Sequence, residues 1–186
     1  MTAYASPRIL VVDDDLTVIA SYRYVLEGDE SSPASRGNSA HGSLEEELFS
    51  DSPNVTENCE NWRIDFVDQG NDAVAAVRKA IADSDPFTVV FLDIRMPPGL
   101  DGYETAQAIR KIDQVVHIVF VSGYSDYTEE ELTAVAGPKH RMSFLPKPVW
   151  PLQLKTKAHA VCTDAKLVEL CSEALRQRRP EAVAGV

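Results

Sequence analysis

Charged and polar side chains follow the apolar runs of this sequence at the points where those runs end. They are Asp13, Asp14, Asp93, Ser122 and Lys147, and they follow four different runs. If the runs are parallel strands of one open sheet, their carboxyl ends lie along one edge, where such sheets bind ligands. We therefore expect the five side chains to converge on one site.

Three carboxylates in one place need a compensating cation. At ~4 Å, each pair repels by about 1 kcal/mol in water and about 4 kcal/mol at an effective dielectric constant of about 20. Oxygen ligands alone favour a hard cation, and a site that keeps waters and accepts phosphate oxygens suits Mg²⁺. Lys147 would add a fixed positive charge, and Ser122 a hydroxyl donor. The set predicts a pocket for a phosphoryl group on a carboxylate nucleophile.

The elements that position these residues alternate along the chain. Strands are expected at 8–12, 64–67, 88–92, 117–121 and 143–145. The first, third and fourth runs are almost wholly apolar, as is usual for parallel strands covered on both faces. Helices are expected at 16–27, 71–82 and 102–111, from near 128 to before 137, and from about 151. This alternation predicts right-handed βαβ crossovers and an open three-layer α/β sandwich.

Spacing within these segments predicts which helical residues are buried. In 71–82, the apolar face is formed by Ala73, Val74, Val77 and Ile81. The helix near 128 has Thr128 followed three residues later by Glu131, the pattern of a capping box.

Composition excludes several classes of protein. The net charge is −11, and 44% of the residues are hydrophobic. Because nucleic-acid binding depends on basic residues that neutralise phosphates, an acidic chain argues against a DNA- or RNA-binding module. No apolar run reaches the roughly 20 residues of a membrane span, and we expect no secretory signal. The three cysteines, Cys59, Cys162 and Cys171, lack metal-ligand spacing and are interpreted as reduced thiols of a cytoplasmic protein.

Two segments lie outside the alternating plan. The insertion 28–61 is rich in serine, asparagine and acidic residues, which predicts a flexible loop. A capping box at Ser43 leaves open a short docked helix or partner site. The tail 163–186 has apolar residues at helical spacing. It would extend the fifth helix or form a sixth, packed on its own domain or used for dimerisation or coupling. We thus divide the chain into a domain at 1–162 and a helical extension at 163–186.

Four motifs occur in order at the expected strand ends. They are VVDD at 11–14, LDIRMP at 92–97 with Asp101-Gly102 following, VSG at 121–123 and FLPKP at 144–148. With them, residues 8 to about 160, apart from the insertion, resemble a response-regulator receiver domain of two-component signal transduction. The resemblance implies a flavodoxin-like (βα)5 fold, a doubly wound parallel sheet with strand order 2-1-3-4-5. Pro146 at the end of the fifth strand agrees with an edge position.

The same resemblance implies a role for each site residue. Asp93 would be the phosphoacceptor. Mg²⁺ would be held by Asp13, Asp14, Asp93 and the backbone carbonyl of Arg95. Lys147 would pair with a phosphoryl oxygen.

A switch is also implied by the resemblance. Ser122 and the backbone N–H of Gly123 would contact the phosphoryl group, and Phe144 would turn inward as Ser122 moves toward Asp93. The peptide bond between Lys147 and Pro148 would be cis.

The resemblance implies a signalling protein rather than an enzyme, with self-phosphorylation and autodephosphorylation as its only reactions. The donor would be a sensor histidine kinase or a histidine phosphotransfer protein in a phosphorelay. Too few residues follow Pro148 for an output domain, so output would run through a downstream protein target, unless the chain is a fragment of a longer one. A homodimer through the fourth- and fifth-helix face or the C-terminal helix is left open. The alternative function is a phosphorylation-independent adaptor. A Mg²⁺-dependent hydrolase would need a second acid where Arg95 stands.

Overall fold

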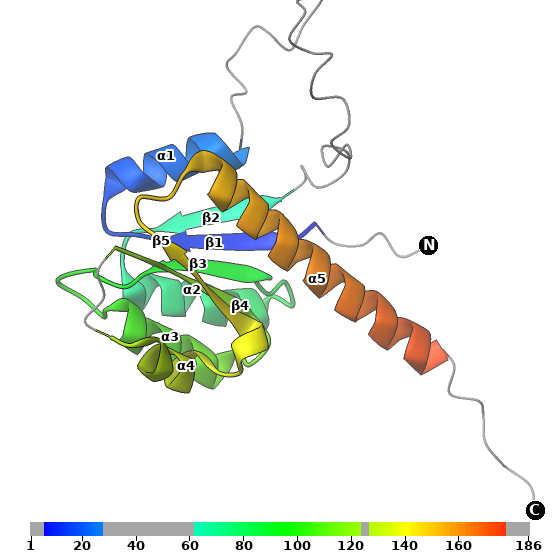
Figure 1. Ribbon diagram of the computed structural model, residues 1–186. Coiled ribbons are helices and arrows are strands. Elements are labelled where there is room, and N and C mark those ends of the chain that lie inside the picture. The colour runs from blue at the N-terminus through cyan, green and yellow to red at the C-terminus, as the bar shows by residue number, and fades with distance from the viewer. Residues whose placement is uncertain (1–5, 28–61, 124–126, 178–186) are drawn as a thin grey trace, which may run out of the picture.

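In the part of the chain that the computed structural model describes, five strands alternate with five α-helices (Figure 1). The structure describes residues 6–27, 62–123 and 127–177, with side chains as far as Ala165. The elements are β1 (Arg8–Val12), α1 (Leu16–Glu27), β2 (Arg63–Val67), α2 (Gly70–Ala82), β3 (Val89–Asp93), α3 (Gly102–Ile112), β4 (His117–Ser122), α4 (Glu129–Ala136), a 3₁₀ turn (Lys139–Arg141), β5 (Met142–Pro146) and α5 (Pro151–Gln177). Each predicted strand is confirmed to within one residue at either end.

All five strands are parallel and lie in the order β2-β1-β3-β4-β5. The predicted doubly wound, flavodoxin-like fold with strand order 2-1-3-4-5 is therefore confirmed. β5 lies at an edge, and its last residue, Pro146, is opposite Ser122 of β4. A proline lacks the N–H that an inner strand would need, so the edge position is the one that tolerates it.

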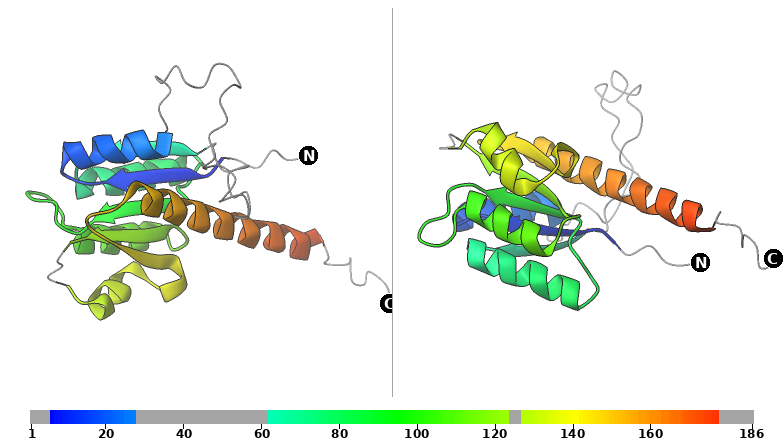
Figure 2. Two further views of the ribbon diagram at one scale, coloured as in Figure 1. Left: turned by 45° about the horizontal axis from the view of Figure 1, so that its top comes forward. Right: turned by 90° about the horizontal axis from the view of Figure 1, so that it is seen from below.

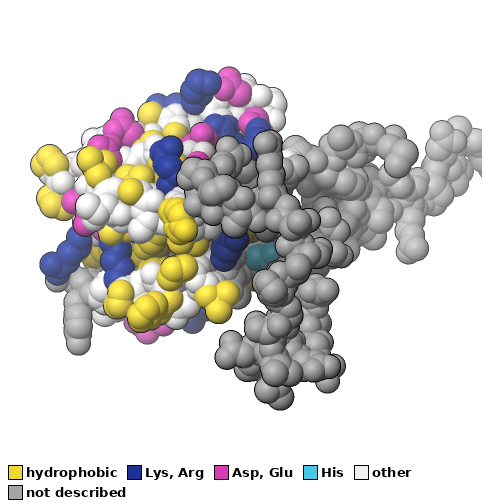
Figure 3. Space-filling view, turned by 90° about the horizontal axis from the view of Figure 1, so that it is seen from above, with side chains coloured by type: hydrophobic (Ala, Val, Ile, Leu, Met, Phe, Trp, Pro, Cys, Tyr) yellow, Lys and Arg dark blue, Asp and Glu magenta, His cyan; other side chains and the backbone are white. Residues whose placement is uncertain are grey.

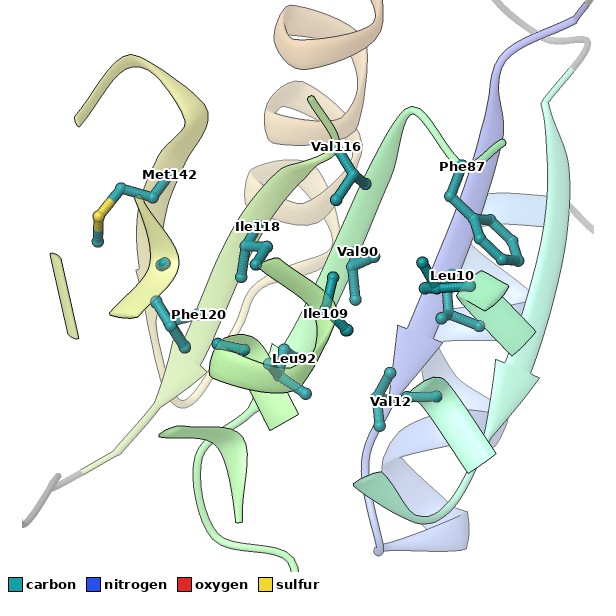
Figure 4. Close-up of a cluster of buried hydrophobic side chains, with 14 of the residues drawn as sticks. Leu10, Val12, Phe87, Val90, Leu92, Ile109, Val116, Ile118, Phe120 and Met142 are labelled. Atoms are coloured by element: carbon teal, nitrogen blue, oxygen red, sulfur yellow. The ribbon is translucent and has the colours of Figure 1, made fainter. Parts of the chain in front are cut away.

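The sheet is covered on both faces (Figure 2). One core lies between the sheet and α2, α3 and α4. It is centred on Leu10, Val90, Leu92, Ile118 and Phe120 (Figure 4). The second core lies under α1 and α5 and contains the alternate strand residues, among them Ile9, Val11, Phe91, Val119 and Val121. Both faces of the inner strands are buried, which explains their nearly continuous apolar runs.

Helix α2 confirms most of its predicted buried face, with one correction. Ile81 was predicted on the buried face of α2 but is 39% exposed, while Ala73, Val77 and Ala80 are buried. The buried face of α2 ends at Ala80, because positions 73, 77 and 80 already form a complete i, i+4, i+7 stripe. Thr128 does cap α4 through the predicted box with Glu131.

The fifth helix continues without a break across residue 162, so the helical pattern after Cys162 extends α5 and forms no sixth helix before Gln177. The division into domains at 162 stays a prediction. The insertion 28–61 and the tail beyond Gln177 lie outside the described residues. Among the helices that the structure describes, none is long and apolar enough to cross a bilayer.

Ion pairs join the strands at the edge of the sheet where β1 and β2 begin. The Arg8 guanidinium contacts Asp65 at 2.6 Å and Asp85 at 3.3 Å, and Arg63 contacts Asp85 at 2.7 Å. Arg8 also lies over the Phe87 ring, 4.4 Å from its centroid. These contacts fix the start of β2 against β1 and the segment that leads into β3.

His117 makes the stability of the fold depend on pH. Burial, and then the charges of Lys157, Arg141 and Arg110, lower its pKa from 6.5 to about 4, and Asp164 opposes them. The unfolded chain binds this proton more tightly, so stability is lost as the pH falls from 6.5 toward 4. Allowing for partial exposure, we expect the loss of unfolding free energy in this window to be about 1–2 kcal/mol.

Urea unfolding across that window measures the effect. The variant His117→Gln, which keeps a polar side chain near the Ser143 hydroxyl, should lose this part of the pH dependence. The hydrogen bond between His117 Nε2 and the Ser143 hydroxyl oxygen spans 3.0 Å. His140→Gln, at an exposed residue of the 3₁₀ turn, is the matched control. Equal pH dependence in wild type and His117→Gln would contradict the assignment.

Candidate functional site

Three carboxylates meet at the carboxyl edge of the sheet. Asp13 directly follows β1, and Asp93 is the last residue of the adjacent strand β3. One oxygen each from Asp13, Asp14 and Asp93 lies within 4.8 Å of the others. Asp13 is 1% exposed and Asp93 6%, whereas Asp14 is half-buried. The structure thus brings together the three acids that the sequence places at strand ends.

Lys147 provides the positive charge of this cluster. It follows β5, and its Nζ lies 2.8 Å from Asp13 Oδ2 and 3.1 Å from Asp93 Oδ1. Its backbone N–H donates to the Ser122 carbonyl at 2.8 Å, which fixes the end of β5 beside the end of β4. The bond between Lys147 and Pro148 is cis, as expected. Side chains from three strand ends therefore form one cation–carboxylate group.

The electrostatics of the cluster follow from its burial. Desolvation raises the pKa of Asp93, and the charge of Asp13 adds to this, while Lys147 opposes it. Burial alone would lower the pKa of Lys147. The hydrogen bond to Asp13 and the charges of Asp93 and Asp13 outweigh burial, so the pKa of Lys147 is raised. Asp93 is consequently a buried carboxylate whose negative charge depends on a nearby cation.

The family model for the response regulator receiver domain matches residues 46–159. The chain belongs to this family. The matched range starts after β1, so it does not include Asp13 and Asp14. Their place in the receiver site comes from the parallel pairing of β1 with β3 and from their proximity to Asp93.

Solved receiver structures have the same fold. A CheY-like receiver domain protein from Methanospirillum hungatei is 19% identical, with a TM-score of 0.59, covering 87% of this chain and 98% of that one. A response regulator receiver protein from Sinorhizobium medicae is 19% identical, with a TM-score of 0.56, covering 88% and 99%. A structure titled adenylate cyclase from Rhodopirellula baltica is 24% identical, with a TM-score of 0.62, covering 92% and 98%. At these identities the likeness concerns the fold. No curated protein matches the chain.

The residues predicted to form a switch lie at the end of β4 and in β5. Ser122 is the half-buried last residue of β4, and Gly123 follows it at the surface. Phe144 of β5 is half-buried and packs on Phe120, with 5.7 Å between ring centroids. The side chain of Arg95, two residues after Asp93, is exposed. The use of the Arg95 carbonyl as a metal ligand stays a prediction.

Tyr22 of α1 is a core residue close enough to the acids for their charges to act on it. It is 6% exposed and packs in the core under α1 and α5. Burial raises its pKa, and the charges of Asp13 and Asp93 raise it further. Since the charges of both acids act on its hydroxyl, Tyr22 lies on the side of α1 that faces them. Helical spacing can indicate that a residue such as Tyr22 faces the sheet, but not how close its ring lies to the ends of the strands.

The start of α3 packs directly on the backbone of Asp93. The Gly102 N–H donates to the Ile94 carbonyl at 2.8 Å. A Cβ at residue 102 would lie 2.4 Å from the Asp93 carbonyl oxygen, so only glycine fits. Any side chain here would push α3 away from β3. Gly102 therefore fixes the distance between Asp93 and the first turn of α3.

Proposed function

We propose that Asp93 accepts a phosphoryl group from a phosphohistidine, carried by a sensor histidine kinase or a histidine phosphotransfer protein. The observation that carries the proposal is the position of the Asp93 carboxylate, 3.1 Å from Lys147 Nζ and beside two further acids. Structural lysines pair with one acid readily. A half-buried lysine shared by two carboxylates, beside a third, is better explained by a site that handles an anion.

In the proposed step, an Asp93 carboxylate oxygen attacks the phosphorus atom. The new oxygen–phosphorus bond forms as the bond between phosphorus and the donor imidazole nitrogen breaks, and that nitrogen keeps the electron pair. Lys147 would turn from Asp93 to a phosphoryl oxygen while staying bonded to Asp13, 2.8 Å away. Ser122 and the Gly123 N–H would bind other phosphoryl oxygens. Fixed donors of this kind stabilise the charge that develops in transfer.

The acids also fit the magnesium ion that receivers generally bind. The donor set consists of carboxylate oxygens, and oxygen is the ligand that Mg²⁺ prefers. Asp13, Asp14 and Asp93 would hold the ion, with the Arg95 carbonyl as a further ligand. When bound, it would neutralise charge on the phosphoryl oxygens. We treat the chain as a signalling domain and not as an enzyme, acting in the cytoplasm.

Apolar side chains beside the site offer a surface for the phosphodonor protein. Leu16 is 66% exposed and lies three residues after Asp13, and Trp150 is 66% exposed and lies three residues after Lys147. They belong to the starts of α1 and α5, two helices that pack together. Figure 3 views the molecule from the α1 side, where hydrophobic and charged side chains alternate. A donor that covers these residues would bring its histidine to Asp93.

Phosphorylation would then act through Ser122 and Phe144. A dianionic group on Asp93 would draw the Ser122 hydroxyl toward it, and Phe144 would move relative to Phe120. The face formed by α4, β5 and α5 would change and would be read by a downstream protein. A homodimer through this face or through α5 stays open.

The test is incubation of the full chain with acetyl phosphate, with and without Mg²⁺, followed by intact-mass measurement. We expect a mass increase of one phosphoryl group that requires Mg²⁺ and is absent from Asp93→Asn. Asp85→Asn, a change at an acid on the opposite edge of the sheet, is the matched control and should be phosphorylated. If the wild-type mass does not change, the proposal fails, and the adaptor alternative replaces it.

A further inference from the structure

A tyrosine joins the starts of α3 and α4. The Tyr127 hydroxyl donates to Asp101 Oδ2 at 2.7 Å. Its ring stacks on Tyr103, with centroids 4.7 Å apart and planes 15° from parallel. The hydrogen bond to Asp101 is the main reason that the pKa of Tyr127 is raised to about 12. Tyr127 therefore makes two geometrically specific contacts with the first residues of α3.

One partner of this bond is a helix cap, and the other directly precedes one. Asp101 is the N-cap of α3 and accepts the Glu104 N–H through its other oxygen at 2.8 Å. Thr128, directly after Tyr127, is the N-cap of α4. The two caps fix the backbone on each side, so the Tyr127–Asp101 bond holds the beginnings of two helices at a set distance.

The α3 end of this connection reaches the acid site. Asp101 is followed by Gly102, which packs against the Asp93 carbonyl too closely for any side chain. The other end leads to Ser122, because Tyr127 follows it by five residues in the chain. Tyr127 is thus connected to the end of β3 through Asp101 and Gly102 and to the end of β4 through the chain, outside the Ser122–Phe144 pair.

A small displacement is enough to separate these contacts. A hydrogen bond at 2.7 Å is lost when donor and acceptor move apart by about 1 Å, and stacked rings are similarly intolerant of sliding. If α4 moves relative to α3 when Ser122 is drawn toward Asp93, that movement separates the Tyr127 hydroxyl from Asp101. A contact made in one of two arrangements shifts the equilibrium between them by its own free energy.

We propose that Tyr127 is a positioning residue, whose hydrogen bond to Asp101 holds the start of α4 against α3 while Asp93 is unmodified and breaks when Asp93 is phosphorylated. The inference rests on the proposed function of Asp93. The hydrogen bond and phosphorylation are thermodynamically linked. If phosphorylation disfavours the bond by a given factor, the bond lowers the equilibrium constant for phosphorylation by the same factor. Loss of one hydrogen bond to a carboxylate at a half-buried position should shift this equilibrium about 5- to 10-fold.

The experiment follows tyrosine Cζ resonances in full-length protein labelled with ¹³C at that carbon. The Tyr127 resonance is assigned by its loss in Tyr127→Phe and recorded before and after addition of acetyl phosphate and Mg²⁺. We expect phosphorylation to move it away from the position of a carboxylate-bonded phenol. Because the arrangement without this bond is the one that phosphorylation favours, its larger population in Tyr127→Phe should make phosphorylation about 5- to 10-fold faster than in wild type.

Two further variants make the test specific. Asp101→Asn keeps an N-cap side chain but removes the charged acceptor, so it should speed phosphorylation in the same direction by a smaller factor. Tyr24→Phe, at a 65% exposed tyrosine of α1, should behave as wild type. A Tyr127 resonance that stays in place while the mass shows full phosphorylation would overturn the inference but leave the proposed function intact. A wild-type chain that gains no mass would overturn both.

Discussion

Replacing Lys147 with methionine is expected to slow phosphorylation of Asp93 by about 100- to 1000-fold, the usual effect of removing one fixed donor from a transferring group. The same change should lower the unfolding free energy by about 2–3 kcal/mol at neutral pH, because Asp13 and Asp93 lose the cation that both contact. This magnitude is set below that of a fully buried pair, since the Lys147 side chain is 28% exposed.

The loss of stability in Lys147→Met should depend on pH. The pKa of Asp93 is already raised by burial, and Lys147 opposes that rise, so the variant should have an even higher Asp93 pKa. A group with a raised folded-state pKa favours folding below its unfolded value of 3.8 and loses this contribution as the pH rises through the folded value. The variant should therefore approach wild-type stability near pH 4 and lose most at about pH 7. Lys147 itself stays charged across this range, because its pKa is raised above 10.5.

Urea unfolding followed by tryptophan fluorescence at the two pH values measures this effect, and intact mass measures the phosphorylation. Lys155→Met, at an exposed lysine of α5, is the control and should change neither. Wild-type phosphorylation kinetics in Lys147→Met would remove Lys147 from the proposed reaction, whatever its effect on stability.

The second large effect is expected at Arg110, far from the acids. Its half-buried guanidinium donates to four backbone carbonyls, those of Ala136, Asp113, Val116 and Arg141, at 2.6, 3.1, 2.9 and 3.4 Å. Burial lowers its pKa, with Arg141 adding to this and Asp113 opposing it. One side chain therefore donates hydrogen bonds to backbone carbonyls at the end of α4, in the α3–β4 connection and directly before β5.

Arg110→Ala should lower the unfolding free energy by about 3 kcal/mol, because partly buried carbonyls would lose their donor. Arg110→Lys should recover only part of the loss, since an ammonium lacks the planar spread that reaches four acceptors. Lys111→Ala, at the exposed neighbour, is the control. Urea denaturation measures all three, and a loss below about 1 kcal/mol in Arg110→Ala would show that water replaces the guanidinium.

The strands and the acid site could be predicted because their signals are local. Each inner strand is a short apolar run, and the residue after it is polar, so run ends alone located Asp13, Asp93 and Ser122. Because the carboxyl ends of parallel strands lie at one edge of the sheet, the side chains were then expected to lie close together.

The unpredicted features depend on three-dimensional contacts between helices. Ile81 has the right spacing for burial, but α2 ends its contact with the sheet at Ala80. The bond from Tyr127 to Asp101 spans 26 residues and depends on the relative placement of α3 and α4. The closeness of Tyr22 to the acids likewise depends on how α1 crosses the sheet. The spacing of residues in a single sequence does not give the distances between side chains on different elements.

The ion pairs among Arg8, Arg63, Asp65 and Asp85 have a consequence for how such a protein diversifies. They clamp β2 at its first residue, immediately after the point where the acidic segment 28–61 rejoins the domain. That junction and the end of α1 lie at the rim opposite Asp93, a full strand length away. We therefore expect that the segment between Glu27 and Trp62 can be lengthened or shortened without displacing the acids at the other end of the strands.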